Sequence, residues 1–311
     1  MAERNIGESV YQRLKSLAKE KRLDTSVLLR RYAQERLMYR LSMSDVAEDF
    51  CVKGGVLLSV YNSGNLLRPT EDIDFNGFQK GASVEVLHDA LKSIVKTPVA
   101  DDGVAFDLST MTIAKDRAGT VSGGKIKIIA RIHTAKVDVR VDVGFGNAIT
   151  PGVRLLEMPT LLDGIAPRPT VLAYPLETVF SEKLHAMAEY GATNTRLKDF
   201  YDIALIIRMH SFSVEDIISA VTNTFLLQER DVPKLPIVCL TSDFADDNEI
   251  AWRIFLNKID EKTNMSFQST VEEIANFVNP IVDLIHKGNH MSGEWEPSSG
   301  WNLLPNNSLS M

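Results

Sequence analysis

The chain has 311 residues, of which 44% are hydrophobic and 24% are charged, a composition typical of a folded protein with room for a catalytic core. A formal net charge of −7 argues against a protein that coats DNA or RNA through a generally basic surface, although a local basic patch stays open. The two cysteines, Cys51 and Cys239, lie far apart and outside any CxxC or CxxH pattern, which argues against a disulfide framework and a zinc site.

The N-terminal part of the chain is polar and helical in pattern. Residues 1–22 lack the apolar core of a signal peptide, and no stretch approaches the roughly 18 apolar residues that span a bilayer. We therefore expect a cytoplasmic protein without a membrane partner. Apolar residues recur at spacings of three and four among many charges, as at Val10, Leu14 and Leu17, which predicts a helical lead-in over residues 1–48.

Residues 49–170 are expected to form an α/β (α+β) core with a mixed sheet, because short β-branched runs alternate with helical periodicity and glycine turns. Strand patterns occur at residues 50–52, 72–75, 104–113, 125–132 and 137–143. Helix patterns occur at residues 56–61 and 83–95.

Residues 171–287 are expected to form a helical domain that completes the active site, after a proline-marked stretch at residues 151–175. Helix patterns occur at residues 176–190, 196–210, 214–227, 249–259 and 271–286. Residues 288–311 are predicted to be a tail rich in Ser, Asn, Pro and Gly, which Trp295 and Trp301 could dock onto the body.

Two aspartates and two glycines carry the chemistry of the predicted core. Asp72 and Asp74 stand two apart in one strand, so their side chains emerge on one face with Cα atoms about 6.5–7 Å apart. Such carboxylates can share two Mg²⁺ (or Mn²⁺) ions, which nucleotidyl transfer needs to activate the attacking oxygen and neutralise the leaving pyrophosphate. Without Cβ atoms, Gly54 and Gly55 let backbone N–H groups approach a triphosphate at a helix N-terminus.

The order of these features is more specific than either feature alone. Lys53-Gly54-Gly55 followed by Arg68-Pro-Thr70-Glu-Asp72-Ile-Asp74 resembles the signature of the polymerase-β-like nucleotidyltransferase superfamily. The resemblance implies that fold, an NTP substrate and divalent metal at Asp72 and Asp74. It also implies contacts to the nucleotide from Lys53, Gly54, Gly55, Arg68 and Thr70.

A third carboxylate is expected on the strand at residues 137–143. Asp138 and Asp142 are both candidates, and they face the same side because an even number of positions separates them. We prefer Asp142, because Val141-Asp-Val-Gly-Phe-Gly146 resembles a segment of the AbiEii/AbiGii-type toxin nucleotidyltransferases. Asn147 departs from that family, which usually has an acid at this position.

The helical half extends the resemblance, which spans roughly residues 25–210. Lys183 lies in the apolar stripe of its helix with Phe180 and Met187, and a buried ammonium needs an anion or a carboxylate. The family resemblance implies that Lys183 contacts the phosphates; the alternative is a stem that extends to water.

Two residues of the next helix pattern also match the family. Arg196 and Asp199 are implied to serve the nucleotide site, with Asp199 orienting Lys183 and Asp202 as a weaker second candidate. An ion pair between Arg196 and Asp199, one turn apart, is the simpler interpretation.

A run of basic residues and a glycine pair admit structural explanations. Ser122-Gly123-Gly124-Lys125 lacks the spacing of a phosphate-binding loop and is predicted to be a hairpin turn. The basic residues could track an RNA backbone or could guard a solvated strand edge; they are Lys125, Lys127, Arg131, His133, Lys136 and Arg140.

The sequence therefore predicts a nucleotidyltransferase that moves NMP from an NTP to an acceptor, with Asp72, Asp74, Asp142 and Lys183 as catalytic residues. The family resemblance implies a bacterial toxin of a toxin–antitoxin or abortive-infection system, with a cognate antitoxin as partner and tRNA as a candidate acceptor. Two alternatives stay open: a nucleotide-binding regulatory or scaffold protein with the same fold, and an antibiotic-modifying nucleotidyltransferase.

Overall fold

A computed structural model describes residues 5–62, 64, 68–78, 83–115, 123–263, 265–288 and 291–305. The chain divides into two compact units: unit 1 is Met1–Asn147 with Val153–Tyr174, and unit 2 is Ala148–Gly152 with Pro175–Met311. Within the described ranges, every helix is too short or too polar to cross a membrane.

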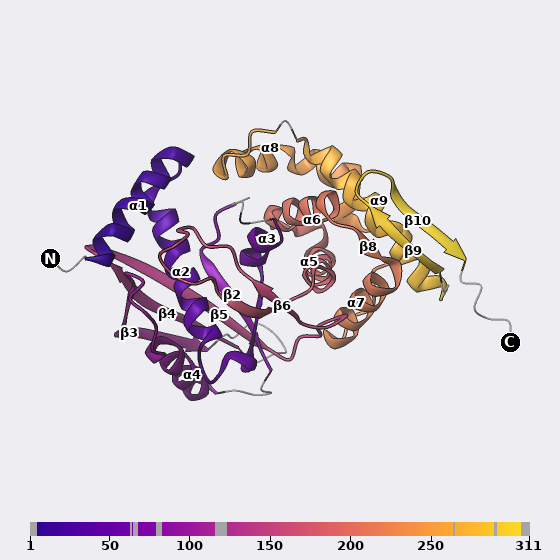
Figure 1. Ribbon diagram of the computed structural model, residues 1–311. Coiled ribbons are helices and arrows are strands. Elements are labelled where there is room, and N and C mark those ends of the chain that lie inside the picture. The colour runs from indigo at the N-terminus through magenta and orange to yellow at the C-terminus, as the bar shows by residue number, and fades with distance from the viewer. Residues whose placement is uncertain are drawn as a thin grey trace. The chain divides into compact units, whose positions relative to one another are not determined.

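Unit 1 is built on a mixed sheet in the order β3-β4-β5-β2-β1-β7-β6 (Figure 1). Its strands are β1 (Phe50–Lys53), β2 (Asp72–Gly77), β3 (Ala105–Lys115), β4 (Gly123–Ile132), β5 (Ala135–Phe145), β6 (Arg154–Glu157) and β7 (Thr170–Ala173). The pairs β2–β5 and β1–β7 are parallel, and the other neighbours are antiparallel. The predicted mixed sheet is confirmed.

Helices cover one face of this sheet in unit 1. They are α1 (Ile6–Lys21), α2 (Thr25–Ser42) and α4 (Val84–Lys96), with α3 (Gly55–Tyr61) directly after β1. The covered face carries the buried alternate residues of β4 and β5, such as Ile128 and Val139, and α4 brings Leu87 against Gly124. The opposite face of β4 and β5 holds the charged alternate residues.

Charged side chains lie inside unit 1 on α2, which is buried along most of its length. Arg36 pairs with Glu35 at 2.7 Å, and Arg40 pairs with Asp102 at 2.7 Å. These ion pairs let α2 pack against the sheet although its sequence lacks a clean apolar stripe.

Unit 2 is helical, as predicted. Its helices are α5 (Leu176–Tyr190), α6 (Leu197–Met209), α7 (Val214–Leu227), α8 (Ser242–Lys258) and α9 (Phe267–Lys287). Aromatic rings form its core: Phe180 packs on Phe277 with centroids 5.0 Å apart, and Trp252 stacks on Phe267 at 4.9 Å. Helix α8 begins seven residues before the predicted start at Glu249, because the acidic stretch after its N-cap, Thr241, offers little apolar periodicity.

Two parts of the chain carry strands that the sequence did not predict. The proline-marked stretch contains β6 and β7, each only four residues long. The predicted tail contains a hairpin of β9 (Met291–Glu296) and β10 (Gly300–Pro305), which pairs with β8 (Phe212–Ser213).

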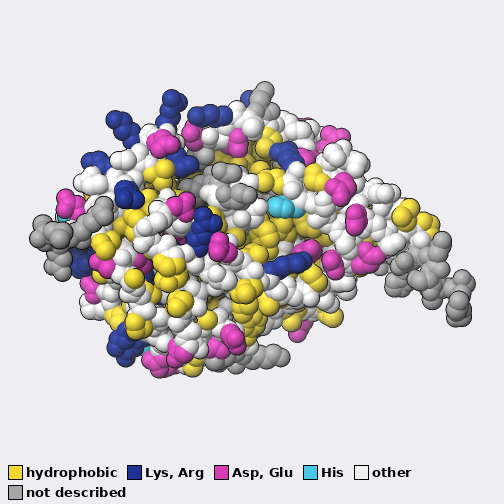
Figure 2. All heavy atoms as spheres, in the orientation of Figure 1, with side chains coloured by type: hydrophobic (Ala, Val, Ile, Leu, Met, Phe, Trp, Pro, Cys, Tyr) yellow, Lys and Arg dark blue, Asp and Glu magenta, His cyan; other side chains and the backbone are white. Residues whose placement is uncertain are grey.

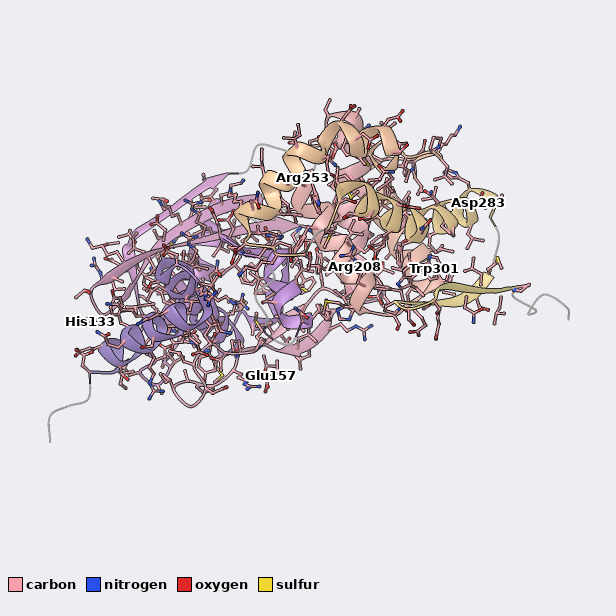
Figure 3. The ribbon with its side chains drawn as sticks, turned by 90° about the horizontal axis from the view of Figure 1, so that it is seen from above. His133, Glu157, Arg208, Arg253, Asp283 and Trp301 are labelled. Atoms are coloured by element: carbon pink, nitrogen blue, oxygen red, sulfur yellow. The ribbon has the colours of Figure 1, made fainter. Side chains whose placement is uncertain are left out.

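The predicted docking by tryptophan is confirmed within unit 2. Trp301 donates its indole N–H to the carbonyl of Phe277 at 2.8 Å, and Trp295 donates to that of Ile207 at 2.7 Å. Arg208 of α6 donates to Glu273 of α9 at 2.8 Å, so the helix and the hairpin both contact α9 (Figure 3).

Candidate functional site

Four charged residues form a row across four strands of unit 1. Lys53 of β1 lies opposite Asp74 of β2, and Asp74 lies opposite Asp142 of β5. Asp142 lies in turn opposite Lys125 of β4, whose Nζ is 3.6 Å from Asp142 Oδ2. Residues that are directly opposite in a sheet point to the same face, about 5 Å apart. The register therefore brings two of the three predicted metal-binding carboxylates side by side.

The third predicted carboxylate, Asp72, lies two positions along β2 from Asp74, opposite Arg140. It faces the same side as the row, because side chains alternate along a strand. Its Oδ1 is buried and has no hydrogen-bond partner among the described residues. Buried carboxylate oxygens normally have a donor or a cation beside them, so this oxygen fits a metal ligand.

Among the described residues, no three His, Cys, Asp or Glu side chains lie close enough together to hold a metal ion. The fit therefore rests on Asp74 and Asp142 as strand neighbours and on the unsatisfied oxygen of Asp72. Asp138 lies outside the row: it is opposite Ile129 and 3.4 Å from Lys127 Nζ.

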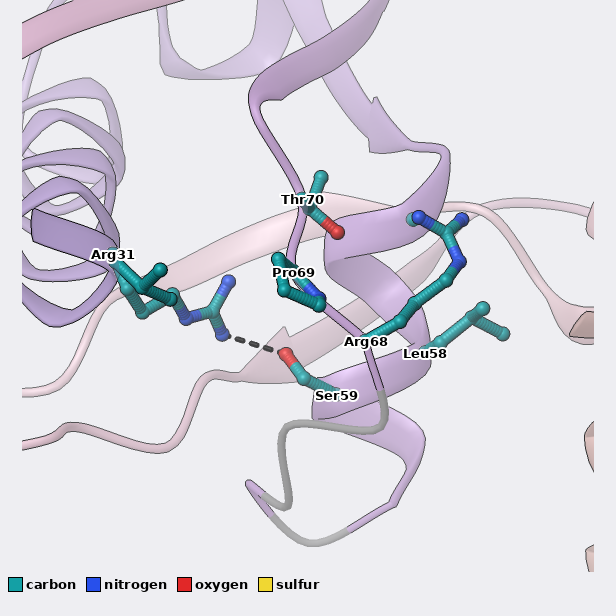
Figure 4. Close-up of a pocket in the computed structure, with 8 residues that line it drawn as sticks. Arg31, Leu58, Ser59, Arg68, Pro69 and Thr70 are labelled. Atoms are coloured by element: carbon teal, nitrogen blue, oxygen red, sulfur yellow. Dashed lines mark hydrogen bonds between the residues drawn. The ribbon is translucent and has the colours of Figure 1, made fainter. Parts of the chain in front are cut away.

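The glycine turn lies against this row. Gly54 has φ +72°, and a Cβ on Gly54 would overlap the carboxylate of Asp74. A Cβ on Gly55 would lie 2.8 Å from Arg68 Nη2 and 3.0 Å from Thr70 Oγ1, and Figure 4 shows both residues beside α3. The structure thus brings Arg68 and Thr70 against Gly55 and Asp74 against Gly54, and the positive φ and the Asp74 contact favour glycine at residue 54.

Four basic residues of β4 and β5 are paired with acids. Besides the contacts of Lys125 and Lys127, Arg131 lies 3.0 Å from Asp107 and Arg140 lies 3.1 Å from Glu71. The strand-edge explanation is wrong, because β3 is the edge of the sheet and β4 and β5 are internal. Gly123 and Gly124 belong to β4 itself, paired with β5, and not to the predicted turn.

A second charged cluster lies in unit 2. Lys183 Nζ donates to Asp199 Oδ1 at 2.8 Å and to Asp202 Oδ2 at 2.7 Å, and Arg196 Nε donates to Asp199 Oδ2 at 2.7 Å. The Lys183 side chain is 12% exposed, so the alternative of a stem that extends to water is wrong. The Arg196–Asp199 ion pair and the Lys183–Asp199 contact are both present.

Burial raises the pKa of Asp199, but the nearby charges of Lys183 and Arg196 outweigh it and lower that pKa to about 2. Asp199 is therefore ionised at neutral pH and holds the Lys183 ammonium in place. Asp202, the weaker second candidate from the sequence, contacts Lys183 as closely as Asp199 does.

Lys125 was not predicted to lie near the three aspartates. The sequence indicated it only as the end of a predicted turn and as one of the basic residues, whereas the structure places it beside Asp142. The signal is the pairing of two alternating strands: once β4 and β5 form a hairpin, residues of matching parity share a face.

Solved structures resemble this chain at low sequence identity. JHP933 from Helicobacter pylori is 15% identical, with 86% of this chain and 94% of that chain covered and a TM-score of 0.46. MenT4, a nucleotidyltransferase toxin from Mycobacterium tuberculosis, is 16% identical, with 84% and 94% covered and a TM-score of 0.46. No curated protein matches the chain.

A family comparison covers most of the chain. Residues 36–274 match the model of the nucleotidyl transferase AbiEii toxin of type IV toxin–antitoxin systems. The matched range contains the charged row, the glycine turn and the Lys183 cluster. The chain therefore belongs to the AbiEii toxin family and is a nucleotidyltransferase.

Proposed function

We propose that this protein transfers a nucleoside monophosphate from an NTP to an acceptor in a metal-dependent reaction, as the toxin of a toxin–antitoxin pair. The observation that carries the proposal is the contact of the glycine turn with Asp74, which lies level with Asp142 across the sheet. Such an arrangement places an anion cradle beside paired carboxylates, the two elements that nucleotidyl transfer requires.

Asp72, Asp74 and Asp142 would hold Mg²⁺ or Mn²⁺. Hard carboxylate oxygens suit these ions, and the buried, unsatisfied Oδ1 of Asp72 supports the assignment. Bound metal would supply charge neutralisation at the leaving pyrophosphate and a lowered pKa for the attacking group.

The residues of the chain itself would position the NTP. Backbone N–H groups at Gly54 and Gly55 can approach a triphosphate because no Cβ shields them, and Arg68 and Thr70 supply further donors beside Gly55. Lys53, in the same row as Asp74, adds a cation.

Lys183 would contact the phosphates, a role that the family resemblance implies. Asp199 and Asp202 fix the position of its ammonium, and Arg196 holds Asp199. A lysine that is held in this way loses little conformational freedom when it meets an anion.

The proposal extends to partners. The family belongs to type IV toxin–antitoxin systems, which supports a cognate antitoxin. We include tRNA as acceptor because Lys125, Lys127 and Arg140 lie on the same sheet face as the three aspartates.

Incubation with each labelled NTP and total cellular RNA tests the proposal. We expect label on RNA with the native chain, and loss of that label with Asp72→Ala. The matched control is Asp138→Ala, on the same sheet face but outside the row, which should keep most of the activity. Equal labelling by both variants, or no labelling of any acceptor by the native chain, would contradict the assignment.

A further inference from the structure

Arg31 of α2 is a buried cation that the proposed reaction does not use. Its side chain is 7% exposed, and Nη2 donates to the hydroxyl of Ser59 on α3 at 2.6 Å (Figure 4). A guanidinium carries five N–H donors, so a single hydroxyl leaves most of its capacity unused. Burial lowers the pKa of Arg31, against the opposing charge of Glu35.

No carboxylate among the described residues forms an ion pair with Arg31. Glu35 lies one helical turn away, but its oxygens accept from Arg36 at 2.7 Å, from the N–H of Leu161 at 2.9 Å, and from the Thr160 hydroxyl. Arg36 and Arg40 on the same helix each have a carboxylate partner. A buried charge without a counter-ion destabilises a fold unless an anion is supplied.

Arg31 lines a cavity of about 860 Å³ in unit 1, within the size range of small-molecule sites. Its other cations are Lys21 and Arg168, and Arg168 is paired with Glu157 at 3.3 Å and Asp163 at 3.1 Å. The lining thus holds three cations and two carboxylates, Glu157 and Asp163, which leaves one positive charge in excess, and Arg31 and Lys21 lie outside the ion pairs of Arg168. Figure 2 shows further Lys and Arg side chains gathered over α1, which carries Lys21.

Apolar side chains complete the lining of this cavity. Leu17 lies on α1 and Leu23 lies between α1 and α2. Val60 lies on α3, and Leu161 lies in the segment after β6. A ligand that combines a phosphate with a flat apolar ring system matches this pairing of cations and apolar surface.

We propose that this cavity binds a nucleoside phosphate, with Arg31 and Lys21 on the phosphate and the leucine side chains against the base. The site is separate from the glycine turn. The described lining of the large cavity includes neither Gly54 nor Gly55, and the smaller cavity of about 20 Å³ that Arg31 and Gly55 both line has room for about one water molecule. The ligand is a free nucleotide or the phosphorylated end of a nucleic acid acceptor.

Equilibrium dialysis in EDTA tests the site without demanding activity. The probes are the four nucleoside monophosphates and a 5′-phosphorylated trinucleotide. We expect Arg31→Met to weaken binding of at least one probe about ten- to hundredfold, as for other hydrogen bonds to charged groups. Arg30→Met, next on the helix, is the matched control and should bind like the native chain. Mononucleotide binding identifies a free nucleotide, and binding of the trinucleotide alone identifies an acceptor end.

A footprint on the native chain guards against a misfolded variant. The same probes should slow acylation of Lys21 and leave Lys19, also exposed on α1, unchanged. Unchanged binding in Arg31→Met, together with unchanged acylation of Lys21 in the presence of every probe, would overturn the inference. An active enzyme with no such site contradicts this inference alone, whereas binding at Arg31 without NMP transfer contradicts the proposed function alone.

Discussion

Gly54→Ala tests the contact between the glycine turn and the carboxylate row. Gly54 has φ +72° and ψ −158°, a region essentially reserved for glycine, where another residue costs about 1–3 kcal/mol. The added methyl group would also overlap the Asp74 carboxylate and force it to move. We therefore expect the free energy of unfolding to fall by about 1–3 kcal/mol and the transfer rate to fall about a hundredfold, as for a misplaced catalytic group.

The matched control for this variant is Gly144→Ala. A Cβ on Gly144 would lie 4.0 Å from Lys53 Nζ, an ordinary contact, and its backbone needs no positive φ. Its unfolding free energy should change by less than about 0.5 kcal/mol. Urea denaturation and NMP transfer from labelled NTP, measured on both variants, provide the comparison. If Gly54→Ala behaved like Gly144→Ala in both assays, the proposed role of the turn would be refuted.

Three further predictions concern the charged clusters. Lys183→Met leaves buried carboxylates without this cation and should lower the free energy of unfolding, measured by urea denaturation, by about 3–5 kcal/mol. Arg253→Met, at an exposed ion pair, is the control and should change that free energy by less than about 1 kcal/mol. The pKa of Asp199 is lowered from 3.8 to about 2, so its stabilisation of the fold is present above pH 3.8 and is lost as the pH falls toward 2. In denaturation measured across that pH window, the free energy of unfolding of the native chain should fall by about 2 kcal/mol more than that of Asp199→Asn. Equal losses in the two proteins would refute the pairing. Lys125→Met removes the cation beside Asp142, so we expect the variant to bind Mn²⁺ severalfold more tightly, as measured by electron paramagnetic resonance. Unchanged or weaker binding of Mn²⁺ would contradict the placement of Lys125 beside Asp142.

Local patterns predicted most of the elements that carry the site. The alternation around Asp72 and Asp74 fixed their common face, and the glycine pair marked the start of α3. Spacing alone could not select Asp142 over Asp138, because both have the same parity. The pairing of β2 with β5 places Asp142, and not Asp138, opposite Asp74, and it joins segments about 68 residues apart in the chain.

Buried charge was the least predictable feature. Helix α2 looks poorly amphipathic because Arg36 and Arg40 are buried and neutralised by partners, of which Asp102 lies far along the sequence. The burial of Arg31 could not be predicted either, because a basic residue in a polar helix normally indicates a solvated face. Strands β6 and β7 were not predicted, because four residues show too little alternation of apolar and polar side chains to distinguish a strand from a loop.

We propose that Asp72, Asp74 and Asp142 share bound metal beside the glycine turn. Crystals grown with Mn²⁺ and a non-hydrolysable NTP analogue would test it by anomalous diffraction. We expect manganese within about 2.1–2.2 Å of oxygens from all three aspartates, with the triphosphate against Gly54 and Gly55. Manganese bound elsewhere, or a triphosphate that does not contact the glycine turn, would contradict it.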